Sequence, residues 1–188
     1  SLIIMIGGIA FNIGNIAGTG MGLNTIFGID VRWGAAISAV ICILIFTSKE
    51  IGNAMDRFAQ ILGIFMVLLA AYVAVASHPP IGEVAVRTFV PTKFEFLPLI
   101  TLIGGTVGGY ITFAGAHRLI EGNMKGIEAV QEATKSAVLG IIVASIMRYA
   151  LFLGALGVAV RGIQFDSTNP AATPFLTVAG IMGYKMFG

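Results

Sequence analysis

The stretch that decides the fold runs from Leu2 to Phe27 and reads LIIMIGGIAFNIGNIAGTGMGLNTIF. It contains no charged residue. Its length exceeds the roughly 20 apolar residues that an α-helix needs to cross a bilayer core of about 30 Å. The stretch therefore predicts a helix that spans a membrane.

The composition of the whole chain supports the same interpretation. Charged residues make up 11% of the 188 residues, against roughly 25% in soluble domains, and hydrophobic residues make up 57%. A soluble fold could not cover so much apolar surface with polar side chains. The net charge of +2 and the lack of a basic run argue against nucleic acid as a partner. We expect an all-α polytopic protein of the plasma membrane, with the lipid bilayer as partner and no sequence feature that sets an oligomeric state.

Five further apolar runs predict more helices of the same kind. We expect a single transmembrane domain over residues 1–188, with about six spans at residues 2–27, 34–47, 58–76, 97–116, 136–160 and 175–187, the last of them truncated. Because the chain is apolar from its first residues and stops inside an apolar run, we expect a fragment of a longer protein. The long connection at residues 77–95 opens with His78, Pro79 and Pro80, which end the preceding helix.

The fourth run contains four glycines in one short window, namely Gly104, Gly105, Gly108 and Gly109. Each glycine inside a helix costs about 1 kcal/mol relative to alanine. The cluster indicates either a close helix crossing or a helix broken between about residues 104 and 110. A broken helix frees backbone N–H and C=O groups, which are tolerated in a membrane only where they line a cavity or bind a ligand. The predicted substrate-binding residues are Gly105, Thr106, Gly108, Gly109 and Tyr110.

Two amides in the first run are candidates for a transport pathway. Asn12 and Asn15 are three residues apart and share a helix face with Thr19. They either bond a neighbouring helix or line a polar pathway through the membrane. The spacing of Gly14, Gly18 and Gly22, one every four residues, favours close packing against another helix.

Arg148 lies at the middle of the run 136–160 and is the third candidate for the pathway. A charge at this depth is costly and usually faces a cavity or a partner, so we predict that its guanidinium faces the protein interior. Its partner is a backbone carbonyl, an acid outside this chain or a bound anion. The sequence contains no HExxH, GxSxG, acid-pair or nucleotide-loop motif, so we expect neither an enzyme nor a cofactor, and it identifies no metal ligand.

Some of these segments resemble a known family. The segment NIAGTGMGLNTIFGI, from Asn15 to Ile29, resembles the third transmembrane helix of the Nramp family of proton-coupled divalent metal transporters. The segment GGTVGGYITFAGAH, from Gly104 to His117, falls where that family has its discontinuous sixth helix. Asp56 stands where the family places an acid before its fifth helix. The resemblance covers nearly the whole chain, as helices three to eight, and implies a LeuT-like fold with inverted repeats and paired broken helices.

The chain also departs from the family in ways that mark it as a divergent member. Asn12 and Asn15 stand where the family carries an Asp and a Glu that serve proton movement, and an amide does not titrate. Residues 108–111 read GGYI where the family has Met-Pro-His-Asn, whose methionine binds the metal. A thioether selects soft metals. Without it, freed carbonyls and the hydroxyls of Thr106 and Tyr110 would favour a harder ion such as Mg²⁺ or Mn²⁺.

The resemblance implies a secondary transporter that moves divalent metal cations across the membrane by alternating access, as a symporter. The alternative is the same scaffold carrying a small organic acid or an amino-acid-like solute, with Arg148 as the partner of the anion. An arginine near the pathway would repel a metal cation and attract a carboxylate. In either case the chain's partner is a transported ion or small solute.

Overall fold

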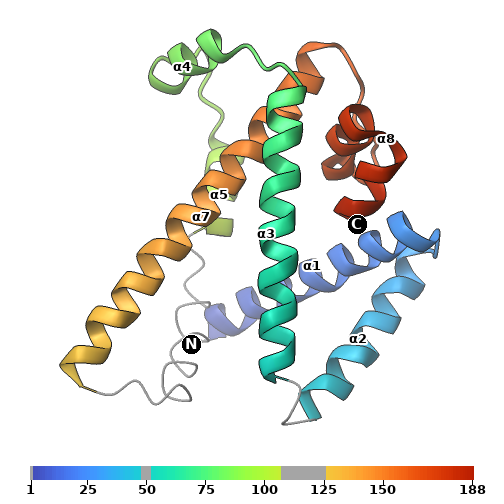
Figure 1. The fold of residues 1–188 in the computed structure, drawn as a ribbon, viewed down its shortest axis with the longest axis vertical. Coiled ribbons are helices and arrows are strands. Elements are labelled where there is room, and N and C mark those ends of the chain that lie inside the picture. Colours follow the sequence, from blue (N-terminus) through green and yellow to red (C-terminus); the bar gives the residue numbers. More distant parts are fainter. Residues whose placement is uncertain (1, 48–51, 107–125) are drawn as a thin grey trace. The chain divides into compact units, whose positions relative to one another are not determined.

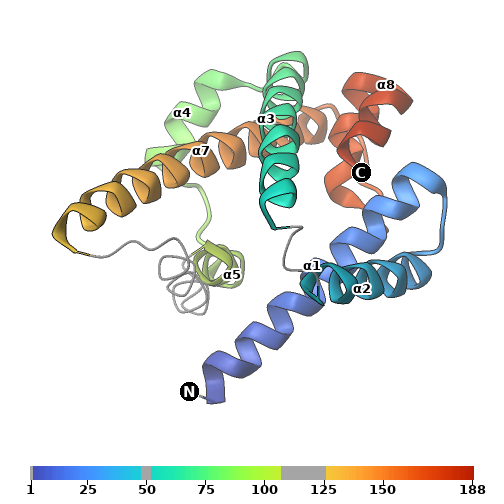
Figure 2. The same ribbon diagram turned by 60° about the horizontal axis from the view of Figure 1, so that its bottom comes forward.

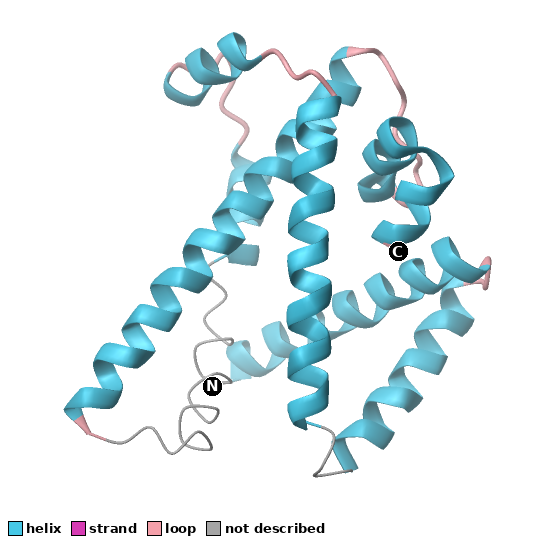
Figure 3. Ribbon diagram, in the orientation of Figure 1, coloured by secondary structure: helices cyan, strands magenta, loops and turns pink. Residues whose placement is uncertain are grey.

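The computed structural model describes residues 2–47, 52–106 and 126–188, and these residues form helices joined by short connections (Figure 1). The α-helices are α1 (Leu2–Phe27), α2 (Val31–Thr47), α3 (Gly52–Ala76), α4 (Ile81–Phe89), α5 (Phe96–Thr106), α7 (Ile127–Val160) and α8 (Thr173–Phe187), with a short 3-10 helix, η1 (Pro170–Ala172), before α8. The described residues contain no strand (Figure 3). This confirms the all-α class.

Three of the described helices are long and apolar enough to cross a membrane. They cover Leu2–Phe27, Arg57–Ala76 and Ala129–Val160, and shorter apolar helices cover Val31–Ile45 and Phe96–Gly105. Large apolar side chains on them, such as Ile3 and Val75, are mostly exposed. Lipid or further protein can cover such a surface, whereas water cannot do so favourably. The protein is an all-α membrane helix bundle, and its organisation as one domain with six spans stays a prediction.

Contacts between residues divide the chain into two units. One unit contains Ser1–Phe11 and Ile81–Ser145, and the other contains Asn12–Pro80 and Ile146–Gly188. The boundary between the units falls within α1 and within α7.

In the second unit, the part of α1 from Asn12 onward and α2 form a helix hairpin (Figure 2). Gly28 ends α1 with a φ of 72°, and the side-chain amide of Asn24 donates a 2.8 Å hydrogen bond to the carbonyl of Ile29. The helices approach so closely at Gly20 and Gly34 that a Cβ on Gly34 would lie 3.1 Å from the Cα of Gly20. These glycines were not singled out from the sequence.

The sequence predicted close packing at three other glycines of α1, namely Gly14, Gly18 and Gly22. A Cβ added to Gly14 or Gly18 would meet no described atom within 4 Å, whereas one added to Gly22 would meet the carbonyl oxygen of Gly188. Within the described chain, the four-residue glycine spacing therefore does not mark a helix crossing at Gly14 or Gly18.

The C-terminal end of α3 packs against the C-terminal part of α7, also in the second unit. Gly154 faces Val73, and Gly157 faces Ser77 so closely that a Cβ there would lie 2.6 Å from the Ser77 carbonyl oxygen. The Ser77 hydroxyl donates a 3.4 Å hydrogen bond to the carbonyl of Leu153. The guanidinium of Arg161 donates a 2.7 Å hydrogen bond to the carbonyl of Ser77, which satisfies a backbone group left open at the end of α3.

The run predicted as one span at residues 175–187 is interrupted in the structure. Within α8, Gly180 has a φ of 64° and a ψ of −161°, a conformation that an L-residue with a side chain rarely adopts. The two halves of α8 fold toward each other, so that the rings of Phe175 and Phe187 stack with centroids 4.3 Å apart. α8 also packs against α3 (Figure 1).

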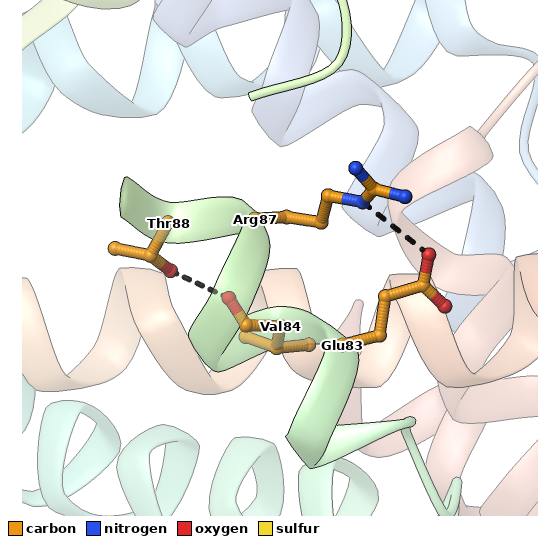
Figure 4. Close-up of polar contacts among 4 residues, drawn as sticks. All are labelled: Glu83, Val84, Arg87 and Thr88. Atoms are coloured by element: carbon orange, nitrogen blue, oxygen red, sulfur yellow. Dashed lines mark hydrogen bonds and ion pairs between the residues drawn. The ribbon is translucent and has the colours of Figure 1, made fainter. Parts of the chain in front are cut away.

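Residues 77–95, interpreted from the sequence as a long loop, contain the helix α4, which belongs to the first unit. Glu83 in its first turn and Arg87 in its last turn each complement the helix dipole. Their side chains are four residues apart and form an ion pair at 3.5 Å (Figure 4). The apolar residues of this segment follow a helical spacing, although no helix was predicted here from the sequence.

The remaining helix boundaries differ from the prediction in modest ways. α2 begins at Val31 instead of residue 34, because the Asp30 carboxylate accepts a 2.9 Å hydrogen bond from the backbone N–H of Arg32 at its first turn. α7 begins at Ile127 instead of residue 136. The predicted span 97–116 is described as a helix from Phe96 to Thr106, and its remainder lies outside the described residues.

Candidate functional site

The predicted substrate-binding segment is only partly described. Gly105 and Thr106 form the end of α5, whereas Gly108, Gly109 and Tyr110 lie outside the described residues. α5 is helical through Gly104 and Gly105, and a Cβ on either glycine would meet no described atom within 4 Å. The described chain therefore gives no support to a close helix crossing at these two glycines. The predicted break stays a prediction for residues 107–110.

The amides of the predicted pathway lie near the middle of α1. Asn12 and Asn15 are both exposed on the described chain, and the hydroxyl of Thr19 donates a 3.0 Å hydrogen bond to the carbonyl of Asn15. The surrounding surface is apolar, since Ile13 and Ile16 are also exposed. An amide on a membrane helix is stable where further protein or a polar pathway covers it, because lipid offers it no hydrogen bond.

Arg148 lies on α7, twelve residues before that helix ends at Val160, which corresponds to about 18 Å along the helix axis. Its side chain is exposed on the described chain. Phe152, one turn further along the helix, is also exposed, and residues 136–160 carry no other charge. A cation at this depth in an apolar helix needs protein, water or an anion around it. That its guanidinium faces the interior of a larger protein stays a prediction.

The described residues contain no group of three or more His, Cys, Asp and Glu side chains that could hold a metal ion. The free cysteine, Cys42, is exposed on α2. In the described part of the chain, a cation would therefore need ligands other than such a cluster, for example backbone carbonyls, hydroxyls or amides.

A cavity of about 300 Å³ lies in the second unit between α3, α7, η1 and α8. Its lining residues are Ala70, Val73, Ala150, Leu151, Phe152, Ala155, Pro170, Ala171, Pro174, Phe175 and Phe187. None of them carries a charged or amide side chain. The cavity can hold an apolar group, but it offers an ion no side-chain ligand.

A buried polar contact that the sequence did not predict joins α1 to the segment before α8. The side-chain amide of Asn169 donates a 3.2 Å hydrogen bond to the hydroxyl of Thr25, and both residues are buried. The Thr25 hydroxyl in turn donates to the carbonyl of Met21, and the Asn169 side-chain oxygen accepts from the N–H of Ala172. An Asn-Pro sequence such as Asn169-Pro170 favours a turn, but nothing in the sequence indicates Thr25 as the distant partner.

Replacing Asn169 with alanine is expected to lower the stability of the protein by about 1–3 kcal/mol, because it leaves the N–H of Ala172 without its side-chain acceptor and removes the amide bonded to Thr25. The midpoint of thermal unfolding in detergent measures this loss. Thr168→Ala is the matched control, because Thr168 is exposed and bonds Asp166 through its backbone N–H. Equal midpoints for the two variants would contradict a stabilising role for the Asn169 side chain.

The chain matches the model of one known protein family. The family model described as "Natural resistance-associated macrophage protein-like", or Nramp, matches residues 1–182. The chain belongs to the Nramp family. The expectation of family membership, drawn from residues 15–29 and 104–117, is thereby confirmed.

The Nramp chain is also similar to two curated proteins of bacteria. It is 53% identical over all 188 residues to the "Uncharacterized membrane protein YcsG" of Bacillus subtilis (strain 168), and it covers 46% of that protein. It is 51% identical over 186 residues, or 99% of its length, to an "Uncharacterized membrane protein" of Haemophilus influenzae, of which it covers 47%. The chain thus spans about half the length of these relatives. No solved structure matches the chain significantly.

Proposed function

We propose that the protein containing this chain is a secondary transporter that carries divalent metal cations across the plasma membrane by alternating access, as a symporter and without enzymatic activity. The observation that carries the proposal is the Nramp match over residues 1–182. The proposal includes a LeuT-like arrangement, in which a broken helix near residues 104–110 lines the substrate site.

The chemistry of the chain favours a hard cation among the divalent metals. Residues 108–111 supply no thioether or imidazole, and the described residues hold no cluster of metal-binding side chains. Carbonyl oxygens of the glycine-rich segment and the hydroxyls of Thr106 and Tyr110 are the ligands we propose. Such oxygen ligands suit Mg²⁺ and Mn²⁺, whereas softer transition metals prefer sulfur or imidazole.

Competition between metals in liposomes tests this proposal. The full-length protein is reconstituted, and uptake of radiolabelled Mn²⁺ is measured with an excess of Mg²⁺ or of Cd²⁺ outside. We expect Mg²⁺ to inhibit Mn²⁺ uptake and Cd²⁺ to inhibit it less. Strong inhibition by Cd²⁺ together with none by Mg²⁺ would contradict the oxygen-ligand site, and a lack of Mn²⁺ uptake would contradict the function itself.

Proton coupling is expected to be weaker than the Nramp resemblance implies, because Asn12 and Asn15 replace the two acids that serve proton movement. Transport into liposomes that contain a pH-sensitive dye measures the protons that accompany each substrate. We expect the Asn12→Asp, Asn15→Glu double variant to increase proton entry relative to the wild type. Stoichiometric proton uptake by the wild type, unchanged in the double variant, would contradict a coupling role for these positions.

A second candidate function is transport of a small organic acid or amino-acid-like solute on the same scaffold. The observation that favours it is Arg148, a cation on an apolar stretch of α7. Its planar guanidinium can bind a carboxylate with two hydrogen bonds. The N-terminal ends of broken helices also favour an anion.

A further inference from the structure

We propose that α4 lies along the membrane surface, with Ile81, Ala85 and Phe89 in the lipid interface and the ion pair of Glu83 and Arg87 in water. This contact of α4 with the membrane does not depend on which substrate the protein carries.

The two faces of α4 differ in chemistry. Ile81, Ala85 and Phe89 follow one another at intervals of four residues and therefore form one stripe along the helix. All three are exposed, with Ile81 at 59% and Phe89 at 86% of full exposure. Glu83 and Arg87 project on another side, where their ion pair is itself largely exposed (Figure 4). A short helix with an apolar stripe and a charged face is typical of segments that lie in a membrane interface.

The one polar side chain beside the apolar stripe is already satisfied. The hydroxyl of Thr88 donates a 2.8 Å hydrogen bond to the carbonyl of Val84, on the side of the helix away from the ion pair (Figure 4). Thr88 therefore has no need of water as an acceptor for its hydroxyl proton. This side of α4 can approach the lipid interface without leaving that donor unpaired.

The connections of α4 favour lipid as the occupant of the stripe. The apolar helix Arg57–Ala76 has the length of a membrane span, and α4 begins at Ile81, only a few residues beyond its end. After α4, the apolar helix Phe96–Gly105 begins within seven residues. A helix tethered at both ends to apolar helices is held near the bilayer surface, since each connecting residue reaches at most about 3.6 Å. Phe94 and Phe96, whose rings pack edge to face at 5.8 Å, add exposed apolar side chains at the start of α5.

Spin-label accessibility tests the orientation of α4. Nitroxide labels are placed on single cysteines at positions 85 and 89 on the apolar stripe and at positions 83 and 87 on the charged face, after Cys42 and other reactive cysteines of the full-length protein are replaced. The labelled protein is reconstituted into vesicles of phosphatidylcholine and phosphatidylglycerol. Collisions with oxygen, which concentrates in lipid, and with a water-soluble nickel chelate are measured at each position.

We expect the ratio of oxygen to nickel collisions to be several-fold higher at positions 85 and 89 than at positions 83 and 87. Equal access to nickel at all four positions would show a water-exposed α4 and overturn the proposal. Low access of both reagents at positions 85 and 89 would show that another part of the protein covers the stripe, and would also overturn it. If Phe89→Cys does not fold, Ala85→Cys tests the same stripe with a much smaller change.

Discussion

Replacing Arg148 with alanine is expected to leave Mn²⁺ uptake unchanged or to raise it. If the guanidinium lies about 10 Å from the pathway, it repels a divalent cation by about 3 kcal/mol at an effective dielectric constant near 20. Removing that repulsion would strengthen metal binding by up to roughly a hundredfold. Membrane insertion should remain intact or improve, because a charge on an apolar stretch of α7 is removed.

The same substitution has the opposite consequence if the cargo is an acid. Arg148→Ala would then abolish uptake while the protein still inserts, and Arg148→Lys would show whether charge alone suffices or whether the planar guanidinium is needed. Uptake of radiolabelled Mn²⁺ and acids by liposomes that contain equal amounts of each variant provides the measurement. Loss of Mn²⁺ uptake in correctly inserted Arg148→Ala would contradict our account of Arg148 in a metal transporter.

Replacing Gly157 with valine is expected to destabilise the crossing of α3 and α7. A Cβ at this position would lie 2.6 Å from both the Cβ and the carbonyl oxygen of Ser77, so the helices must move apart. Overpacking of this kind costs about 1–3 kcal/mol and occasionally more. Separation would also lengthen the hydrogen bond between the Ser77 hydroxyl and the Leu153 carbonyl and the one between Arg161 and the Ser77 carbonyl. We expect a lower midpoint of thermal unfolding and less monodisperse protein in detergent.

Gly140→Val is the matched control for this prediction. Gly140 lies on the same helix, α7, and a Cβ there would meet no described atom within 4 Å. Both variants introduce the same β-branched residue into a helix, so their difference isolates the contact with Ser77. A Gly157→Val protein as stable as Gly140→Val, measured at the same heating rate, would contradict the packing described between α3 and α7.

The helices could be predicted from the sequence where length and apolar character alone decide them. The limits of α1 were predicted as residues 2–27 and agree with the structure, because an uncharged run of this length has few other stable conformations in a membrane. α4 was not predicted, because a short helix that carries Glu83 and Arg87 lacks the length and apolar character of a membrane span. The bend at Gly180 was missed for another reason: a glycine in an apolar run fits a continuous helix as well as a break.

The candidate site could be predicted only where its residues lie in distinctive segments, and contacts between residues distant in the sequence could not be predicted. Family membership followed from short segments such as residues 15–29, where the order of glycines and amides is distinctive. The bond between Thr25 and Asn169 joins residues 144 positions apart, and neither residue type indicates its partner. Gly20 and Gly34 look like other glycines in the chain until the α1–α2 hairpin brings them together.

Uptake by the full-length wild-type protein in liposomes tests the central claim most directly. One preparation, with empty liposomes as control, is given radiolabelled Mn²⁺ and, in parallel, a panel of radiolabelled small organic acids and amino acids. Our account predicts robust, saturable Mn²⁺ uptake and no transport of any acid above the control. Transport of an acid with no uptake of Mn²⁺ would contradict it and would identify this member of the Nramp family as a carrier of organic solutes.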